Sequence, residues 1–251
     1  MYHLFMNVVA VDGKDPVSFT FFTGYMAMLA ASVFFLFERG SVDAKWKTSL
    51  LVSGLITGIA AVHYYYMRDF YGATGETPVA LRYIDWTLTV PLMCVEFYLL
   101  LKPAGAKSSF MWKLILASAL MLVAGYIGEA FNPTASMSHS VLWGTISAVG
   151  YVYVLYSAWL GEAKRLADAS NSASVKSGIQ ALAWFVLVGW AIYPIGYMAG
   201  PGGWLGPQGA GLLQSKDLNL FYNIADAINK IGFGLVVYNI SITESKKTQI
   251  A

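Results

Sequence analysis

The stretch LNLFYNIADAINKIGFGLVVY, residues 218–238, indicates what kind of protein this chain is. It is apolar over enough length to cross a bilayer, which takes roughly 20 residues of helix. Asp226 and Lys230 lie within it four residues apart, so a helix brings them onto one face. An ammonium group at membrane depth costs about 3 kcal/mol, so its presence there indicates a function. A buried lysine can lose its proton and form a Schiff base with an aldehyde, and a neighbouring carboxylate can then balance the resulting cation.

The rest of the chain has the same apolar character. Of its 251 residues 57% are apolar and 12% are charged, whereas soluble domains carry about 25% charged residues. The composition therefore predicts a membrane protein. Because the connections between apolar stretches are short, we expect residues 1–251 to form a single all-α domain, a bundle of seven transmembrane helices. The expected spans are 18–37, 48–67, 81–101, 110–128, 141–160, 179–198 and 218–238.

Basic residues outside these spans are distributed unevenly. Eleven lie in the first, third and fifth connections and in the C-terminal tail, and three lie on the other side, at Lys14, Arg68 and Lys216. By the positive-inside rule this predicts a cytoplasmic C-terminus and an N-terminus outside. The basic residues flank spans rather than forming a patch, which argues against nucleic-acid binding. Cys94 has no second cysteine to pair with, and the segment before Pro16 lacks the pattern of a signal peptide.

The third expected span, LRYIDWTLTVPLMCVE over residues 81–96, carries a polar stripe. At about 100° per residue its polar side chains fall within about 80° of one another. Lipid does not accommodate them, so they are expected to face the interior of the bundle. Snorkelling to the interface explains an arginine at the end of the span but not a mid-span aspartate. The stripe consists of Arg82, Asp85, Thr89, Met93 and Glu96, with Trp86 at its edge.

The predicted orientation arranges these groups along the membrane normal. Asp85 falls on the outer half of the third span and Glu96 on the inner half, about 16 Å apart. Asp226 lies one turn to the outside of Lys230. A central amine with carboxylates on both sides indicates a proton path with a switch in its middle.

Several motifs resemble those of microbial rhodopsins. Residues 82–92 resemble the third helix of that family, WAIYP at 190–194 its sixth, and YNIADAINK at 222–230 its seventh. The motif HYYYMR at 63–68 resembles the proteorhodopsin branch. The resemblance covers all seven spans. It implies all-trans retinal bound covalently to Lys230 as a Schiff base.

The resemblance also implies roles for the ionisable groups. Asp85 matches the primary counterion and proton acceptor, and Asp226 matches the second counterion. Arg82 matches the arginine beneath them, and Thr89 the hydroxyl beside the acceptor. Glu96 matches the cytoplasmic proton donor. An apolar surrounding favours the neutral form of a carboxyl group, which suits a donor that begins the cycle protonated.

A second set of residues matches the surroundings of the retinal. His63 matches a histidine that hydrogen-bonds the acceptor carboxylate, and Met93 matches a colour-tuning position where methionine favours green absorption. Trp86, Trp190 and Tyr193 match the aromatic walls of the pocket. The expected cofactor-binding set is Trp86, Thr89, Met93, Met121, Gly125, Gly144, Ser147, Trp190, Tyr193, Pro194, Tyr197, Asp226, Asn229 and Lys230.

Gly144, which follows Trp143, has two readings. In xanthorhodopsin-like pumps a glycine here leaves a side opening for a carotenoid antenna. A small residue also serves close packing between helices. The sequence leaves both open.

Asp85, Thr89 and Glu96 together are typical of outward proton pumps of the proteorhodopsin type. In this family anion pumps replace the acceptor with a neutral residue, sodium pumps have Asn, Asp and Gln at these places, and sensors usually lack the donor carboxylate. We therefore expect a light-driven proton pump in a bacterial plasma membrane, surrounded by lipid, and not an enzyme. Family likeness implies a homo-pentamer or hexamer with no obligate protein partner. The alternatives are a photosensor that signals through a partner, a seven-helix ligand receptor and a Schiff-base enzyme.

Overall fold

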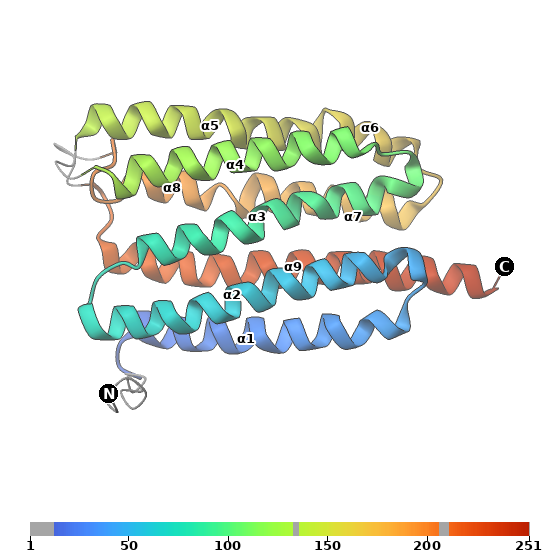
Figure 1. Cartoon of the computed structure of the whole chain (residues 1–251), viewed down its shortest axis with the longest axis horizontal. Helices are drawn as coiled ribbons and strands as arrows, with labels where there is room; N and C mark the ends of the chain where they lie inside the picture. Colours follow the sequence, from blue (N-terminus) through green and yellow to red (C-terminus); the bar gives the residue numbers. More distant parts are fainter. Residues whose placement is uncertain (1–12, 133–135, 206–210, 251) are drawn as a thin grey trace.

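The computed structural model describes residues 13–132, 136–205 and 211–250. Within them, seven apolar helical segments are long enough to cross a membrane, and they lie side by side in one bundle (Figure 1). The expected all-α protein with seven transmembrane helices is confirmed. The first five are α1 (Pro16–Glu38), α2 (Lys47–Thr74), α3 (Val79–Leu101), α4 (Ser108–Ala130) and α5 (Met137–Trp159). The sixth comprises α7 (Ala173–Trp184), η4 (Phe185–Gly189) and α8 (Ile192–Ala199), and the seventh is α9 (Ser215–Ile250).

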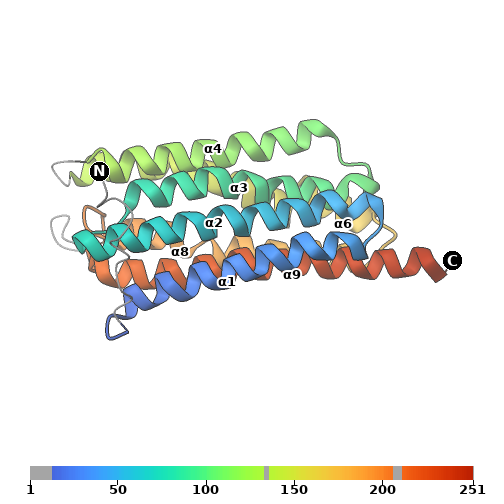
Figure 2. The same cartoon turned by 60° about the horizontal axis from the view of Figure 1, so that its bottom comes forward.

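Short connections alternate between the two ends of the bundle. The turns η1 (Arg39–Ser41) with η2 (Ala44–Trp46), and η3 (Lys102–Ala104), lie at the end where α9 finishes, whereas α1 begins at the opposite end (Figure 1). Successive helices pack on one another, and α9 closes the bundle against α1, α2 and α7. Figure 2 shows α1, α2 and α9 side by side. This closure brings α9 next to segments that are far from it in the sequence.

The sequence predicted a single spanning segment at 179–198. In the structure the α-helix of this sixth span is interrupted in its middle. Its middle, Phe185–Gly189, is a π-helical turn, in which the Trp190 amide donates to the carbonyl of Phe185 at 2.9 Å. Pro194 follows in α8 and has no amide hydrogen, so the regular hydrogen-bond ladder is also interrupted there. A π-turn of this kind widens the helix locally and frees backbone carbonyls.

The freed carbonyls are satisfied by side chains from two other helices. The hydroxyl of Tyr151 on α5 donates to the carbonyls of Val186 and Leu187 at 3.0 and 3.3 Å. The amide of Asn229 on α9 donates to the carbonyl of Gly189 at 2.9 Å. Irregular backbone inside a membrane is tolerated where protein groups satisfy it. The break in the sixth span therefore depends on tertiary contacts.

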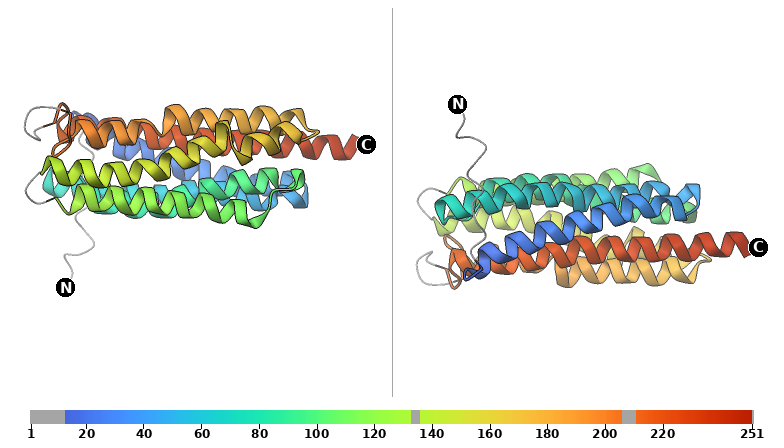
Figure 3. Two further views of the ribbon diagram at one scale, coloured as in Figure 1. Left: turned by 90° about the horizontal axis from the view of Figure 1, so that it is seen from above. Right: turned by 90° about the horizontal axis from the view of Figure 1, so that it is seen from below.

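Two segments outside the expected spans are also helical. Between the fifth and sixth expected spans lie α6 (Glu162–Ala169) and the start of α7, and α9 continues twelve residues past the expected end of its span at Tyr238. Figure 3 shows α9 extending beyond the other helices. The Ser172 hydroxyl donates to Glu244 Oε1 at 2.7 Å, which ties this extension to the start of α7.

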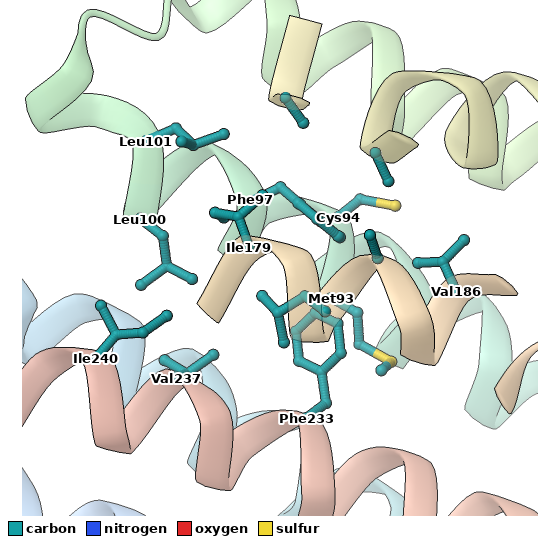
Figure 4. Packing of buried hydrophobic residues seen from close by; sticks show 14 of the residues in the cluster. Met93, Cys94, Phe97, Leu100, Leu101, Ile179, Val186, Phe233, Val237 and Ile240 are labelled. Atoms are coloured by element: carbon teal, nitrogen blue, oxygen red, sulfur yellow. The ribbon is translucent and has the colours of Figure 1, made fainter. Parts of the chain in front are cut away.

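A large apolar cluster fills the half of the bundle in which α9 ends. Most of its members come from α2, α3, α4, α5, α7 and α9, and Phe97, Leu100, Val237 and Ile240 meet there (Figure 4). All four are at most 1% exposed. This packing separates the middle of the bundle from that end and surrounds the part of α3 that carries Glu96.

Candidate functional site

Lys230 and two carboxylates meet in the middle of the bundle. Lys230 Nζ lies 2.6 Å from Asp85 Oδ2 and 3.0 Å from Asp226 Oδ2. All three residues are at most 3% exposed. Asp226 reaches Lys230 from one turn away on α9, as the sequence predicted, and Asp85 reaches it from α3. Pairing compensates part of the cost of burying three charges.

Asp226 is held by three further donors. The hydroxyls of Tyr64 and Tyr193 donate to its Oδ2 and Oδ1 at 2.8 and 2.6 Å, and the indole of Trp86 donates at 3.2 Å. Hydrogen bonds to a carboxylate favour its charged form. These hydrogen bonds and the contact with Lys230 therefore stabilise the carboxylate of Asp226.

Asp85 is held much less firmly. Its Oδ2 accepts from Lys230, but its Oδ1 has no hydrogen-bond partner among the described residues. The Thr89 hydroxyl donates to the backbone carbonyl of Asp85 at 2.9 Å and not to its carboxylate. The two carboxylates beside Lys230 thus differ, because only the one on α3 has an oxygen without a hydrogen-bond partner among the described residues.

His63 does not form the expected hydrogen bond. Its Nδ1 lies 3.9 Å from Asp85 Oδ1, beyond hydrogen-bonding distance. The same nitrogen lies 2.9 Å from the carbonyl of Ile59, one turn earlier on α2. This backbone contact competes for the ring nitrogen nearest Asp85. The side chain is a neighbour of the carboxylate in this structure and not its hydrogen-bond partner.

The rest of the expected stripe lies on the buried face of α3. Arg82, Met93 and Glu96 are at most 2% exposed, like Asp85 and Thr89. Glu96 accepts a hydrogen bond from Ser53 of α2 at 2.9 Å through Oε1, and its Oε2 has no partner in the part of the chain described. Glu96 is thus a buried carboxyl group with few polar contacts, and its neighbour in the sequence, Phe97, belongs to the apolar cluster.

A cavity of about 330 Å³ opens beside Lys230. Of the expected cofactor-binding residues all but Thr89 line it. The exception has a simple cause, since the Thr89 side chain turns back to its own helix. The sequence missed the remaining lining residues, which are Tyr83, Val90, Leu122, Ala148, Tyr151, Met198, Trp204 and Tyr222.

The space beside Gly144 is filled by two aromatic side chains. A Cβ atom on this glycine would lie 2.7 Å from Tyr197 Cε1 and 3.1 Å from the indole of Trp204. The Tyr197 ring is itself anchored, because its hydroxyl donates to the carbonyl of Ser140 at 2.9 Å. Close packing therefore requires a glycine at this position, whatever else binds there.

Sequence reasoning missed the polar partners that reach the site from other helices. Three of these partners are buried: Tyr64 bonds Asp226, Ser53 bonds Glu96, and Asn219 bonds Arg82. Each is a polar residue inside an apolar span, which is the signal that could have drawn attention to it. Tyr83, which donates to Glu129 at 2.9 Å, is a fourth case.

Comparison with known proteins identifies the family of this chain. Residues 15–244 match the model of the bacteriorhodopsin-like protein family. The chain belongs to this family. Two bacteriorhodopsin-like relatives are proteorhodopsins of gamma-proteobacteria, each covering 94% of this chain and 90% of its own length. The blue-light absorbing protein of Hot 75m4 is 45% identical over 236 residues, and the green-light absorbing protein of EBAC31A08 is 44% identical over 238.

A solved structure agrees with the fold. Xanthorhodopsin, described as a light-driven ion pump with dual chromophore, superposes with a TM-score of 0.81 at 29% identity. The match covers 93% of this chain and 95% of xanthorhodopsin. Together with its seven membrane-length helices, family membership makes this bacteriorhodopsin-like chain a multi-pass membrane protein.

Proposed function

We propose that this bacteriorhodopsin-like protein is a light-driven outward proton pump that carries all-trans retinal on Lys230. One observation carries the proposal: the buried amine of Lys230 opens onto a cavity and lies 2.6 Å from a carboxylate with a free oxygen. The residues present fit retinal, because a Schiff-base-forming amine and aromatic walls such as Trp86 and Trp190 line the same cavity. The proteorhodopsin relatives are named for light absorption, which supports the assignment.

Retinal, when bound, would be held by Lys230 as a Schiff base and would supply a light-driven isomerisation beside that nitrogen. Asp85 accepts the proton from that nitrogen, because its Oδ1 is free while both oxygens of Asp226 are occupied by donors. Asp226 stays charged and balances the site. Two interacting carboxylates titrate as a set, so the proton moves to whichever member is less stabilised as an anion.

Glu96 returns a proton to the Lys230 nitrogen from the other side. Its burial in the apolar cluster favours the neutral acid, and Ser53 donates to it. The charge distribution of the connections supports a cytoplasmic C-terminus, which puts Glu96 on the inner side. Net transfer then runs from the cytoplasm to the outside. A buried donor carboxyl also favours a pump over a photosensor, which gains nothing from fast reprotonation.

The setting follows from the same reasoning. The protein works in the bacterial plasma membrane, with protons as its cargo and lipid around its helices. We propose a homo-pentamer or hexamer without an obligate protein partner, and a transport role rather than an enzymatic one. Met93 lines the cavity and favours green absorption.

Replacing Lys230 tests the proposal. Addition of all-trans retinal to the apoprotein in membranes is expected to produce a visible absorption band, and borohydride under illumination is expected to fix the chromophore to Lys230. Lys230→Ala removes the only amine in the cavity lining described here, so it is expected to give no band. Lys113→Ala is a matched control, since that lysine is 56% exposed and pairs with Glu162 at the surface. A pigment formed equally by Lys230→Ala would refute the proposal.

We further propose that a carotenoid antenna binds beside Gly144 only when the Trp204 indole leaves. The indole and the Tyr197 ring occupy that space, and Trp204 lies in the connection after α8, where a side chain moves more easily than within a helix. Trp204→Ala is expected to increase binding of a hydroxylated carotenoid at least tenfold over the unsubstituted protein.

The measurement for this prediction is induced circular dichroism, with excitation transfer from carotenoid to retinal. Trp112→Ala is the control, because that indole is 57% exposed on α4, away from the cavity. Equal carotenoid binding by the Trp204→Ala and Trp112→Ala proteins contradicts the prediction.

A further inference from the structure

Arg82 is a buried cation that pairs with no carboxylate in the described chain. It is 1% exposed, and its guanidinium lies 4.8 Å above the ring of Tyr222. Its Nε and Nη1 have no hydrogen-bond partner among the described residues. Asp85 lies one turn deeper on the same helix with an unpartnered Oδ1. Arg82 and Asp85 therefore lie one turn apart, each with unpartnered polar atoms, and no hydrogen bond joins their side chains.

Arg82 forms one side-chain hydrogen bond among the described residues. Arg82 Nη2 donates to Asn219 Oδ1 at 3.0 Å. Asn219 is fully buried near the start of α9, and its own amide donates to Thr77 Oγ1 at 3.2 Å. This second bond fixes the orientation of the amide, so that its oxygen faces the guanidinium. Thr77 itself lies in the connection between α2 and α3.

We propose that Asn219 is a positioning residue that holds Arg82 turned away from the two carboxylates, and that it thereby sets how readily Asp85 takes up a proton. The inference rests on the proposed function and goes beyond it, because it assigns a role to a side chain that contacts neither Lys230 nor Asp85. Without the Asn219 oxygen, Arg82 loses its one side-chain hydrogen bond among the described residues, and the unpartnered Oδ1 of Asp85 lies one turn away on the same helix. An arginine drawn within hydrogen-bonding reach of a buried carboxylate stabilises its anion.

The other ionisable groups of this region are arranged so that Asn219 is the polar anchor of Arg82. Asp226 is occupied by Lys230, Trp86 and two tyrosines. Glu129 accepts from Tyr83, and it interacts with Arg82 through space without an ion pair between them. The titratable or charged side chains around Arg82 and Asp85 are His63 and Tyr64 of α2, Tyr83 of α3, Glu129 of α4, Tyr193 of α8, and Tyr222, Asp226 and Lys230 of α9.

Two substitutions with opposite electrostatic effects test the proposal. Asn219→Leu removes the acceptor, so Arg82 turns inward and the acid-induced red shift of the pigment is expected at lower pH. Asn219→Asp places an anion on the guanidinium, so the red shift is expected at higher pH. Each displacement is expected to be about one pH unit, the lower end of what one charge causes at close range. Asn223→Leu is the control, because it is an equally buried amide one turn along α9 that bonds Thr20 and not Arg82.

The measurement is a spectral titration of the purified pigment. Opposite displacements by the two Asn219 variants, with the midpoint of Asn223→Leu unchanged, support the proposal. Displacement in the same direction, or none, overturns it. If Asn219→Leu does not fold, Thr77→Val carries the same prediction at smaller size, because it frees the Asn219 amide. An unsubstituted protein that forms no titrating pigment would overturn the proposed function itself, whereas a normal parent with unresponsive variants overturns only the role of Asn219.

Discussion

Asp85→Asn is expected to abolish light-driven proton transport at neutral pH while leaving retinal bound. Lys230 Nζ lies 2.6 Å from Asp85 Oδ2, and the second oxygen of that carboxylate is free to receive a proton. Asparagine keeps the shape of the side chain but cannot take up a proton. Asp226 does not replace it, because Tyr64, Tyr193 and Trp86 stabilise its anion. Loss of a positioned proton acceptor lowers turnover by about 10²-fold or more.

The measurement is the initial rate of light-induced pH change in vesicles of known orientation, with an absorption spectrum of each sample. The spectrum of Asp85→Asn is expected to be shifted to the red, because the anion nearest the cation is gone. Glu129→Gln is the control, since it alters a carboxyl group that bonds Tyr83 and lies outside the contacts of Lys230. A variant without Asp85 that pumps at the rate of its parent would show that another group accepts the proton.

Glu96→Gln is expected to slow recovery of the dark state about 10²-fold while leaving the first proton transfer intact. Glu96 is a fully buried carboxyl group on the side of the bundle that lacks Asp85 and Asp226. Without it, protons reach the Lys230 nitrogen only from water through the apolar packing of Figure 4. The recovery rate should therefore rise in proportion to proton concentration.

Flash photolysis over a range of pH measures this recovery. Ser53→Ala is the companion variant, because it removes the hydrogen bond at 2.9 Å but keeps the carboxyl group. It is expected to change the recovery rate less than tenfold and to leave the recovery nearly independent of pH. Recovery in Glu96→Gln that is as fast as in the parent, and insensitive to pH, would remove Glu96 from the donor role.

The parts of the site that helical periodicity determines could be predicted from the sequence. The register of an α-helix placed Asp226 beside Lys230 and gathered Arg82, Asp85 and Glu96 on one buried face of α3, because residues three or four apart share a side. The cavity lining came from the resemblance of the motifs to microbial rhodopsins, and not from periodicity.

Contacts between helices could not be predicted in this way. The bond from Tyr64 to Asp226 joins residues 162 positions apart, and no local rule fixes which faces of α2 and α9 meet. The π-turn between α7 and α8 depends on Tyr151 and Asn229 from other helices. The sequence of the sixth span, apart from Pro194, therefore does not predict it. The environment of Gly144 was ambiguous for the same reason, since Trp204 comes from a connection whose path depends on the whole bundle.

The most direct test of the central claim is the pH of the medium around intact cells that express the protein with retinal, recorded in light and in darkness. The account predicts acidification of the medium in light that reverses in darkness, collapses with a protonophore and is absent from cells expressing Lys230→Ala. An unchanged medium, alkalinisation, or an acidification that a protonophore does not affect would contradict it.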